Sequence, residues 1–464
     1  MKFRFPGIIA LLAFTLHAGA TVRLPAVIGD NMVLQQQSNV PLWGTARTGA
    51  TVSITTSWDH HRYTVRADAG GKWKTEIATP AAGGPYEIVF SDGEPLRVSN
   101  VLIGEVWVCS GQSNMEISLK GYANQPVLNG NDIIAHAGNP QLRLFHLKRA
   151  VSHTPLEDAG GSWAVSAPEA AAGFSAVGFQ FAKMLQETLH VPVGIIESSW
   201  GGTPIEAWMN RQSLQGFPQV KLPAAGAKPS AHSPTDLFNA MINPIAGYGI
   251  KGFLWYQGEA NRSRSGTYAG LMAAMVQSWR QLWGGGTLPF YFVQIAPWAY
   301  PDHQEGVALL REAQYRASQD IPHSGMVVSM DVGSKTTIHP PDKTTIARRL
   351  LYWALGDTYG QKGIAYKTPA YRGIKTAGDS AVIVFSDIPG GLTTFGKPLD
   401  GFEVAGADKE FHPATARVVK STVVVRSDAV PHPVAVRYVF KAWAVGTLFS
   451  TDGLPVAPFR TDDW

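Results

Sequence analysis

Short strands and helices alternate through the middle of this chain, and this alternation restricts the fold more than any other feature. Between residues 101 and 357, runs rich in Val, Ile and Phe are separated by longer segments with apolar residues at helical spacing. The helical segments are 175–190, 268–283 and 345–357. Such alternation favours a three-layer α/β domain with a mainly parallel sheet. In these sheets the ligand site lies beyond the carboxyl ends of the strands.

The two flanks of this segment have a different pattern. Residues 21–100 consist of short stretches in which apolar and polar residues alternate between Gly, Pro, Asp and Asn breaks. Residues 358–464 return to the same pattern. Both are typical of β-strands with one buried face. We therefore expect a β-sandwich-type domain on each side of the α/β domain, with boundaries near residues 100 and 357.

The first 20 residues resemble a secretory signal peptide. Lys2 and Arg4 precede an apolar run that ends in Ala18-Gly19-Ala20, a small-residue cleavage pattern. The run is shorter than the roughly 20 residues that a membrane span needs. We therefore expect no membrane span and a mature protein that is exported to the periplasm or beyond the cell.

Composition and charge exclude several classes of function. The chain has 464 residues and a formal charge of +4, with no dense block of Lys or Arg, so nucleic acid is not expected as a partner. Its one cysteine, Cys109, rules out an intrachain disulfide and lies in an apolar run, where a buried core residue is expected rather than a nucleophile. Asp59, His60 and His61 predict a solvated hairpin tip, because no second group of metal ligands lies nearby in the sequence.

Ser113 is the first candidate for catalysis. It follows the apolar run VWVCSG and precedes NMEISLK, which has the pattern of a helix. A serine at such a junction presents its hydroxyl at the edge of the sheet, and its amide can help to stabilise an oxyanion. The alternative is a serine that only caps a helix.

Three other polar groups follow predicted strands of the same domain. Gly201 and Gly202 come after VPVGIIESS, and Gln257 comes after IKGFLWY. Glycine amides and a glutamine side chain are suitable oxyanion donors, although a tight turn and a structural glutamine are the simpler alternatives. His339 lies in a loop before the last helix and is the candidate base for a serine nucleophile.

Four sequence blocks resemble those of the sialate O-acetylesterase branch of the SGNH hydrolases, a branch that also contains bacterial esterases of acetylated hemicellulose. The blocks are CSGQSNME, GGTPIEAW, LWYQGEAN and IHPPDK. The segments PTDLFNAMINPI and GLPVAPFRT, and the β–hydrolase–β layout, are also similar to this family. The resemblance covers nearly the whole mature chain.

The resemblance implies a fold and an active site. The fold would be a flavodoxin-like sheet flanked by helices, with neither metal nor other cofactor. Ser113 would be the nucleophile that forms an acetyl-enzyme, and His339 would be its base. The amides of Ser113 and of Gly201 or Gly202, together with the side chain of Gln257, would form the oxyanion hole.

The chain departs from the family at the catalytic acid. Members of the family have an aspartate three residues before the histidine, whereas this chain has Thr336 there. Asp331 is the nearest acidic residue upstream, and we expect it to orient His339. Asp342 is an alternative, as is a Ser–His dyad in which a backbone carbonyl holds the ring.

Several residues near these blocks are candidates for binding the substrate. Glu206 and Trp208, or Glu259 and Asn261, would line the pocket or support its loops. Arginines are candidates for binding the carboxylate of a sialate. These arginines are Arg143, Arg262, Arg264 and Arg311.

The expected protein is thus an exported serine carbohydrate O-acetylesterase that removes acetyl groups from saccharides of hemicellulose, such as xylan or xyloglucan. One alternative is a sialate O-acetylesterase. A second, from a different class, is a non-catalytic carbohydrate-binding protein, because the sequence does not identify the acid.

Overall fold

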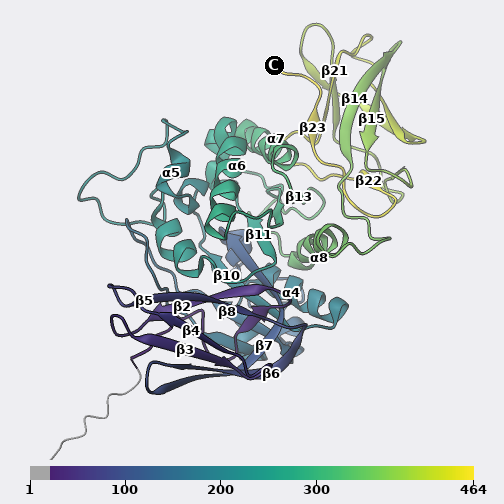
Figure 1. Ribbon diagram of the computed structural model, residues 1–464. Coiled ribbons are helices and arrows are strands. Elements are labelled where there is room, and N and C mark those ends of the chain that lie inside the picture. The colour runs from purple at the N-terminus through teal and green to yellow at the C-terminus, as the bar shows by residue number, and fades with distance from the viewer. Residues whose placement is uncertain (1–20) are drawn as a thin grey trace, which may run out of the picture.

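The computed structural model describes residues 21–464, so the expected signal peptide lies outside the described residues. Figure 1 shows a β-region at the N-terminal end, a central part with helices around a sheet, and a second β-region at the C-terminal end. The structure thus combines a central α/β part with antiparallel sheets at either end of the chain.

Strand β7 (Pro95–Gly111) connects the N-terminal β-region to the central sheet. Its first half pairs antiparallel with β6 (Gly83–Ser91) and in parallel with β1 (Val33–Gln35). Its second half pairs in parallel with β10 (Val193–Ser199) and with β11 (Gly252–Tyr256). The boundary expected near residue 100 thus falls within one continuous strand.

The central sheet is mainly parallel, as predicted. Its strand order is β13-β12-β11-β7-β10-β8-β9, and only β9 runs antiparallel to its neighbour. In the flavodoxin order, the first strand lies between the second and the third. Here β10, the third parallel strand along the chain, lies between β7, the first, and β8, the second, and helix α4 packs against both β8 and β10. The strand order at this edge therefore differs from the flavodoxin order that the resemblance implied. The remaining strands are β8 (Asn139–His146), β9 (Trp163–Ser166), β12 (Phe290–Val293) and β13 (Ser324–Val327).

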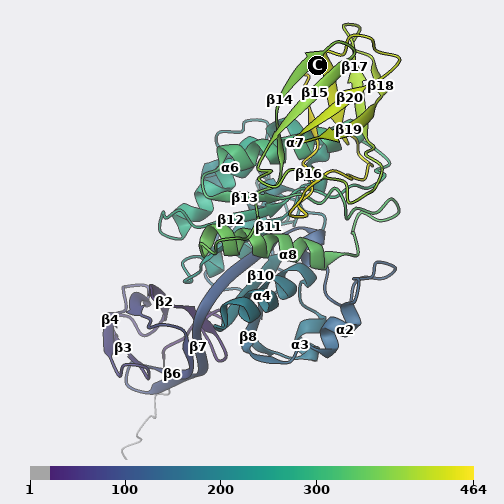
Figure 2. The same cartoon turned by 90° about the vertical axis from the view of Figure 1, so that its right-hand side faces the viewer.

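Helices cover both faces of this sheet. Helices α4 (Ala176–Leu189) and α8 (Lys343–Trp353) pack together, away from α6 (Ser265–Leu282) and α7 (Gln304–Asp320) (Figure 2). Trp107 and Cys109 of β7 belong to the core that α4 and α8 cover, whereas Val106 and Val108 belong to the core on the other face. This alternation follows from the two-residue period of a strand.

Cys109 is a core residue, as expected. It is fully buried, and burial raises the pKa of its thiol well above the usual value. A carbon added at Gly178 of α4 would lie 2.7 Å from the cysteine sulfur, so the helix packs closely on the strand here. The thiol is therefore neither exposed nor ionised.

Helix α7 was missed by the sequence analysis. Its buried face includes Val307 and Leu310 but also Arg311 and Gln314, so its apolar stripe is interrupted by two polar residues. Gln314 donates to the backbone oxygens of Val293 and Gln257 and accepts from the Ile295 amide. These polar residues hold the ends of β11 and β12, which a count of apolar positions does not detect.

The remaining helical segments are short. They are α1 (Ser113–Glu116), α2 (Gly130–Ala135), α3 (Pro168–Ala172), η1 (Ile205–Trp208), α5 (Arg211–Leu214), η2 (Phe238–Ile242), η3 (Asn243–Ile245), η4 (Glu259–Arg264) and η5 (Ala354–Thr358). Within residues 21–464, no helix combines the length and the apolar character needed to cross a bilayer.

The predicted strands of the N-terminal region are present. They are β2 (Asn39–Thr45), β3 (Thr51–Thr56), β4 (Arg62–Arg66), β5 (Lys72–Ala78) and β6. Strands β3 and β4 pair as a hairpin, and Asp59, His60 and His61 lie exposed at its tip, as the sequence predicted.

The C-terminal region consists of two four-stranded sheets and a two-stranded ladder. One sheet contains β14 (Ala370–Ala377), β15 (Ser380–Ser386), β20 (Thr422–Arg426) and β19 (Thr415–Val419). The other contains β18 (Phe411–Pro413), β17 (Phe402–Ala405), β21 (Ala435–Tyr438) and β23 (Phe459–Arg460). The ladder pairs β16 (Leu392–Thr393) with β22 (Phe449–Ser450).

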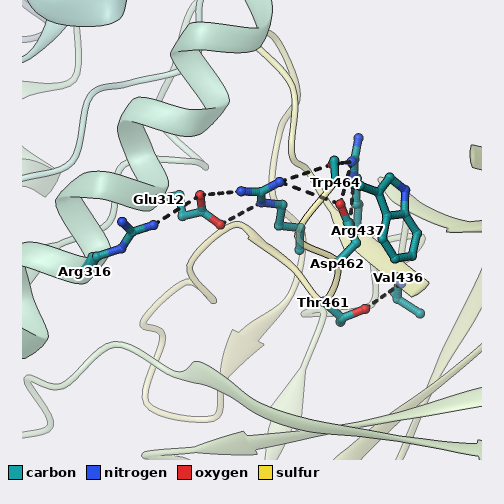
Figure 3. Close-up of polar contacts among 8 residues, drawn as sticks. Glu312, Arg316, Val436, Arg437, Thr461, Asp462 and Trp464 are labelled. Carbon is teal, nitrogen blue, oxygen red and sulfur yellow. Dashed lines mark hydrogen bonds and ion pairs between the residues drawn. The ribbon is translucent and has the colours of Figure 1, made fainter. Parts of the chain in front are cut away.

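Ion pairs and a buried arginine attach this region to the central domain. Arg460 donates to both carboxylate oxygens of Glu312 on α7, at 2.8 and 3.0 Å (Figure 3). Within the C-terminal region, Arg437 donates to both oxygens of Asp462. Arg311 of α7 is fully buried and donates to the backbone oxygens of Lys441 and Ala442. The C-terminal region therefore has a fixed position on α7.

The end of β7 depends on Gly111. Its φ is +139°, and a carbon added there would lie 2.2 Å from the backbone oxygen of Tyr256 in β11. We expect Gly111→Ala to lower the free energy of unfolding by about 1–3 kcal/mol, the usual cost of a strained backbone. Chemical denaturation would measure it. Gly173→Ala is the control, because nothing lies near its added carbon, and a change within about 0.5 kcal/mol is expected. Equal changes in both variants would contradict the prediction.

Candidate active site

Ser113 lies at the carboxyl edge of the central sheet. Strand β7 ends at Gly111, and Ser113 begins α1 two residues later. Gln112 connects the two: its amide donates to the Tyr256 oxygen, and its side-chain oxygen accepts from the amides of Gly258 and Ala260. The turn is therefore held against the end of β11, and the serine follows it.

His339 reaches this serine from the loop before α8. Its Nε2 lies 2.7 Å from the Ser113 hydroxyl, and its Nδ1 contacts the side-chain oxygen of Gln125. An amide oxygen only accepts hydrogen bonds. The proton of the neutral imidazole is therefore on Nδ1, which leaves Nε2 free to accept the proton of the serine.

The structure contradicts the prediction that Asp331 orients His339. Both oxygens of Asp331 accept from Arg349, at 2.7 and 2.6 Å, because a guanidinium matches a carboxylate with two parallel hydrogen bonds. Asp342 instead caps α8, where it accepts from the amide and the hydroxyl of Thr345. Neither acid contacts the histidine, and the third member of the constellation is the neutral side chain of Gln125.

Gln125 belongs to a loop that the sequence analysis did not consider. The backbones of Tyr122 and Gln125 exchange two hydrogen bonds of 3.0 Å, which close a tight turn between α1 and α2. Gly121 begins the turn with a φ of +73°, and a carbon there would lie 2.6 Å from the Gln125 oxygen. No local pattern connects this loop to a histidine more than 200 residues away.

Two of the four expected oxyanion donors are already bonded to protein acceptors, and two are not. The amide of Gly201 donates to Glu116 at 2.9 Å, and the side-chain nitrogen of Gln257 donates to Thr203 and Asn261. Gln257 is fully buried, and both of its N–H groups are used, so its expected role as a donor is contradicted. Within residues 21–464, the amides of Ser113 and Gly202 donate to no protein acceptor.

Glu206, Trp208 and Asn261 are buried and bond with the protein's own loops, so their predicted contact with substrate stays a prediction. The Asn261 side chain donates to Glu206 at 2.9 Å and accepts from the Ile205 amide at 3.0 Å. The Trp208 ring packs edge-on against Trp255. These residues join the loop after β10 to the loop after β11, the alternative that the sequence analysis left open.

Glu259, also expected near the substrate, instead belongs to a buried network behind Ser113. Asn114, next to the serine, donates to Glu259 at 2.6 Å and to the backbone oxygen of Ile338 at 3.1 Å. Lys343 donates to the Asn114 oxygen at 2.6 Å. Asn114 thus connects three of the sequence blocks, and neither it nor Lys343 was singled out from the sequence.

Burial and charge alter the proton affinities in this network. Burial, followed by the charge of Lys343, lowers the pKa of His339 to about 4. Burial also lowers the pKa of Lys343 to about 7 and raises that of Glu259. At neutral pH the imidazole is therefore neutral, the form that a general base requires.

Polar and aromatic side chains surround the serine on its outer side. Tyr122 is 38% exposed, and its hydroxyl donates to Glu116 at 2.9 Å. Arg149 pairs with the same carboxylate and lies over the Trp200 ring at 5.3 Å. We call this group, in which Tyr122 and Arg149 are exposed over a buried Glu116 and Trp200 lies beside Arg149, the mouth of the site.

Comparison with known proteins gives a consistent result. Residues 103–350, more than half of the chain, match the family model described as carbohydrate esterase, sialic acid-specific acetylesterase. Human sialate O-acetylesterase is 31% identical over 76% of this chain and 74% of its own length, and the rat protein is 30% identical over 77% of each. The crystal structure of a carbohydrate acetylesterase from Xanthomonas citri superposes with a TM-score of 0.87 at 39% identity, over 96% of this chain and all of that one.

The first test of this site separates Gln125 from Asp331. We expect Gln125→Ala to lower kcat/KM for an aryl acetate by about 10- to 100-fold, part of the roughly 10²- to 10⁴-fold that a positioned base supplies. Asp331→Asn should leave kcat/KM per folded molecule unchanged and lower the free energy of unfolding by about 1.5–3 kcal/mol, because the Arg349 pair is weakened. The reverse pattern would restore Asp331 as the acid.

The second test is the pH dependence of kcat/KM. A protonated His339 cannot accept the serine proton, so activity should fall as the pH drops through about 4, the pKa of this residue. Between about pH 5 and neutrality the profile should be nearly flat. A midpoint near 6.5, the ordinary histidine value, would show that burial does not act as described.

Proposed function

The chain belongs to the carbohydrate esterase family of sialic acid-specific acetylesterases, and we propose that it is an exported serine O-acetylesterase of hemicellulose-derived saccharides, such as those of xylan or xyloglucan. The family consists of ester hydrolases that act on acetylated carbohydrates, so the alternative of a non-catalytic binding protein is set aside. The observation that carries the proposal is the 2.7 Å contact between His339 Nε2 and the Ser113 hydroxyl.

The proposed reaction has two halves. In the first, His339 takes the Ser113 proton as the serine oxygen bonds to the acetyl carbon, and the ester bond to the sugar then breaks as the histidine returns the proton to the sugar oxygen. In the second, His339 takes a proton from the water that attacks the acetyl carbon, and it returns this proton to the Ser113 oxygen as the acetyl–serine bond breaks and acetate leaves. The Gln125 oxygen, by accepting from Nδ1, keeps Nε2 directed at the reacting oxygens.

We propose that the amides of Ser113 and Gly202 stabilise the oxyanion. Both are without a protein acceptor, and Gly202 follows Gly201, where an added carbon would lie 3.2 Å from the Ser113 β-carbon. A φ of +75° at Gly202 is a conformation that glycine adopts without strain. We also propose that the central domain is an SGNH hydrolase domain, since Ser113, Gly202 and His339 correspond to three of that family's blocks.

The arginines favour a neutral sugar over a sialate. Arg143 is buried and donates to Asn31, Asn100 and Pro140 below the sheet, and Arg311 is buried on backbone oxygens. Arg262 pairs with Asp302, and Arg264 pairs with Glu206. Arg149, at the mouth, is already paired with Glu116. Each of these arginines already has a protein acceptor, and a sialate carboxylate would share the guanidinium with it.

A sialate O-acetylesterase is the second candidate. It is favoured by the curated relatives, which are named for that activity in rat and human. Arg149 is the arginine that would bind the sialate carboxylate in that case, because it is partly exposed beside the serine. The signal-peptide pattern of residues 1–20 supports export for either candidate.

The decisive experiment measures acetate release from acetylated xylooligosaccharide, acetylated xyloglucan and O-acetylated sialic acid. Wild type, Ser113→Ala and a control, Ser427→Ala in the C-terminal region, are compared. We expect release from a neutral saccharide, a loss of roughly 10⁴-fold or more in kcat/KM in Ser113→Ala, and full activity in the control. Release from sialic acid alone would favour the second candidate. No release from any substrate, with an aryl acetate also intact, would overturn both.

A further inference from the structure

A buried lysine lies behind the nucleophile, and the proposed reaction does not use it. Lys343 is 1% exposed and is the first residue of α8. Its ammonium donates to Asn114 at 2.6 Å and lies 5.9 Å from the centre of the Tyr256 ring. Among the described residues it has no direct ion pair with a carboxylate.

This position is costly for a positive charge. Burial removes the water that would solvate an ammonium, and the amino end of a helix repels cations. The cost is visible in the lowered pKa of the lysine, about 7. A lysine buried at such a place, bonded to the neighbour of a reactive serine, points to a role in the reaction.

The Asn114 side chain is oriented by two opposite charges. Its oxygen accepts from Lys343, and its nitrogen donates to Glu259 and to the Ile338 oxygen. Asn114 follows Ser113, and Ile338 precedes His339. The lysine therefore fixes, through one amide, both the start of the nucleophile's helix and the loop that carries the base.

We propose that Lys343 is a positioning residue for acyl transfer: its ammonium holds the Asn114 side chain, and through it both the start of the nucleophile's helix and the loop that carries His339. Its charge also acts on a ring that, among residues 21–464, has no carboxylate partner: Gln125 orients the ring but supplies no negative charge. In an ordinary triad the aspartate stabilises the imidazolium. Here the charge that acts on the ring, that of Lys343, is positive.

The charge of Lys343 affects the second proton transfer of each half-reaction, in which the imidazolium gives its proton to the leaving oxygen. The imidazolium forms when His339 takes the serine proton, and it must give that proton to the sugar oxygen as the ester bond breaks. A sugar alkoxide is a poor leaving group unless it is protonated. An imidazolium made more acidic by Lys343 transfers this proton more readily, although the neutral imidazole is then a weaker base.

The other groups around the histidine do not supply the same effect. The ring nitrogens contact Gln125 and Ser113, and the Tyr122 ring packs edge-on against the imidazole, all uncharged at neutral pH. The Glu116 carboxylate beyond Tyr122 is paired with Arg149. Asp331 is paired with Arg349, and Asp342 caps α8. Glu259 lies on the far side of Asn114, where Arg311 also acts on it.

Lys343→Met tests this role, and Lys251→Met is the matched control. Lys251 also lies over a tyrosine ring, Tyr359, at 5.5 Å, but at the start of β11, away from Ser113. Because the inference rests on the proposed function, the first readout is independent of ester hydrolysis: the titration of His339 by NMR of the histidine Cε1 signals, assigned with His339→Gln. We expect its midpoint to rise by about one pH unit or more in Lys343→Met and to stay unchanged in Lys251→Met.

A second readout separates this effect from misfolding. The rate at which a fluorophosphonate inactivates the enzyme is measured against pH, and the fraction of sites labelled at completion counts folded molecules. In Lys343→Met, the pH at which the inactivation rate falls on the acid side should rise with the NMR midpoint, while all sites are still labelled at completion. If this pH and the midpoint stay at the wild-type values in correctly folded protein, the inference is wrong. Failure of the proposed function would differ: fluorophosphonate would then label neither protein.

Discussion

The continuous strand β7 is the constraint on which the rest of the structure depends. It belongs first to the N-terminal β-region and then to the centre of the parallel sheet, between β10 and β11. Its end at Gly111 is set by close contact with Tyr256, and Ser113 follows immediately. Because neighbouring parallel strands end at the same edge of a sheet, the loops after β10 and β11 meet the serine there.

The electrostatics of the site differ from those of a serine triad with an aspartate. The histidine is oriented by a neutral amide, and the charged groups nearby, Lys343 and Glu259, lie behind the serine on either side of Asn114. Burial dominates the lowered proton affinity of the imidazole. The ring therefore stays in its basic form at neutral pH without an acid beside it. A hydrogen-bond partner is still required to orient the ring.

Polar side chains were the main source of error in reading this sequence. Gln257 follows a strand, where a donor to the substrate was expected, yet its side chain donates to Thr203 and Asn261 in neighbouring loops. Asp331 has the position of a catalytic acid, yet it pairs with Arg349. Helix α7 escaped detection because Arg311 and Gln314 occupy its buried face. In each case the polar group is bound to a partner in another element or loop of the folded chain, which the local sequence context does not identify.

The sequence by itself determined the alternation of strands and helices except for α7, the β-rich character of the two flanks, and Ser113 and His339 as candidates. These depend on periodicity and on local motifs, which are properties of neighbouring residues. Only the tertiary structure decided that Gln125 holds the histidine, that Asn114 joins three blocks and that Lys343 is buried behind the serine. Hydrogen bonds and burial at these positions depend on contacts between residues more than 100 positions apart, and the folded chain alone creates them.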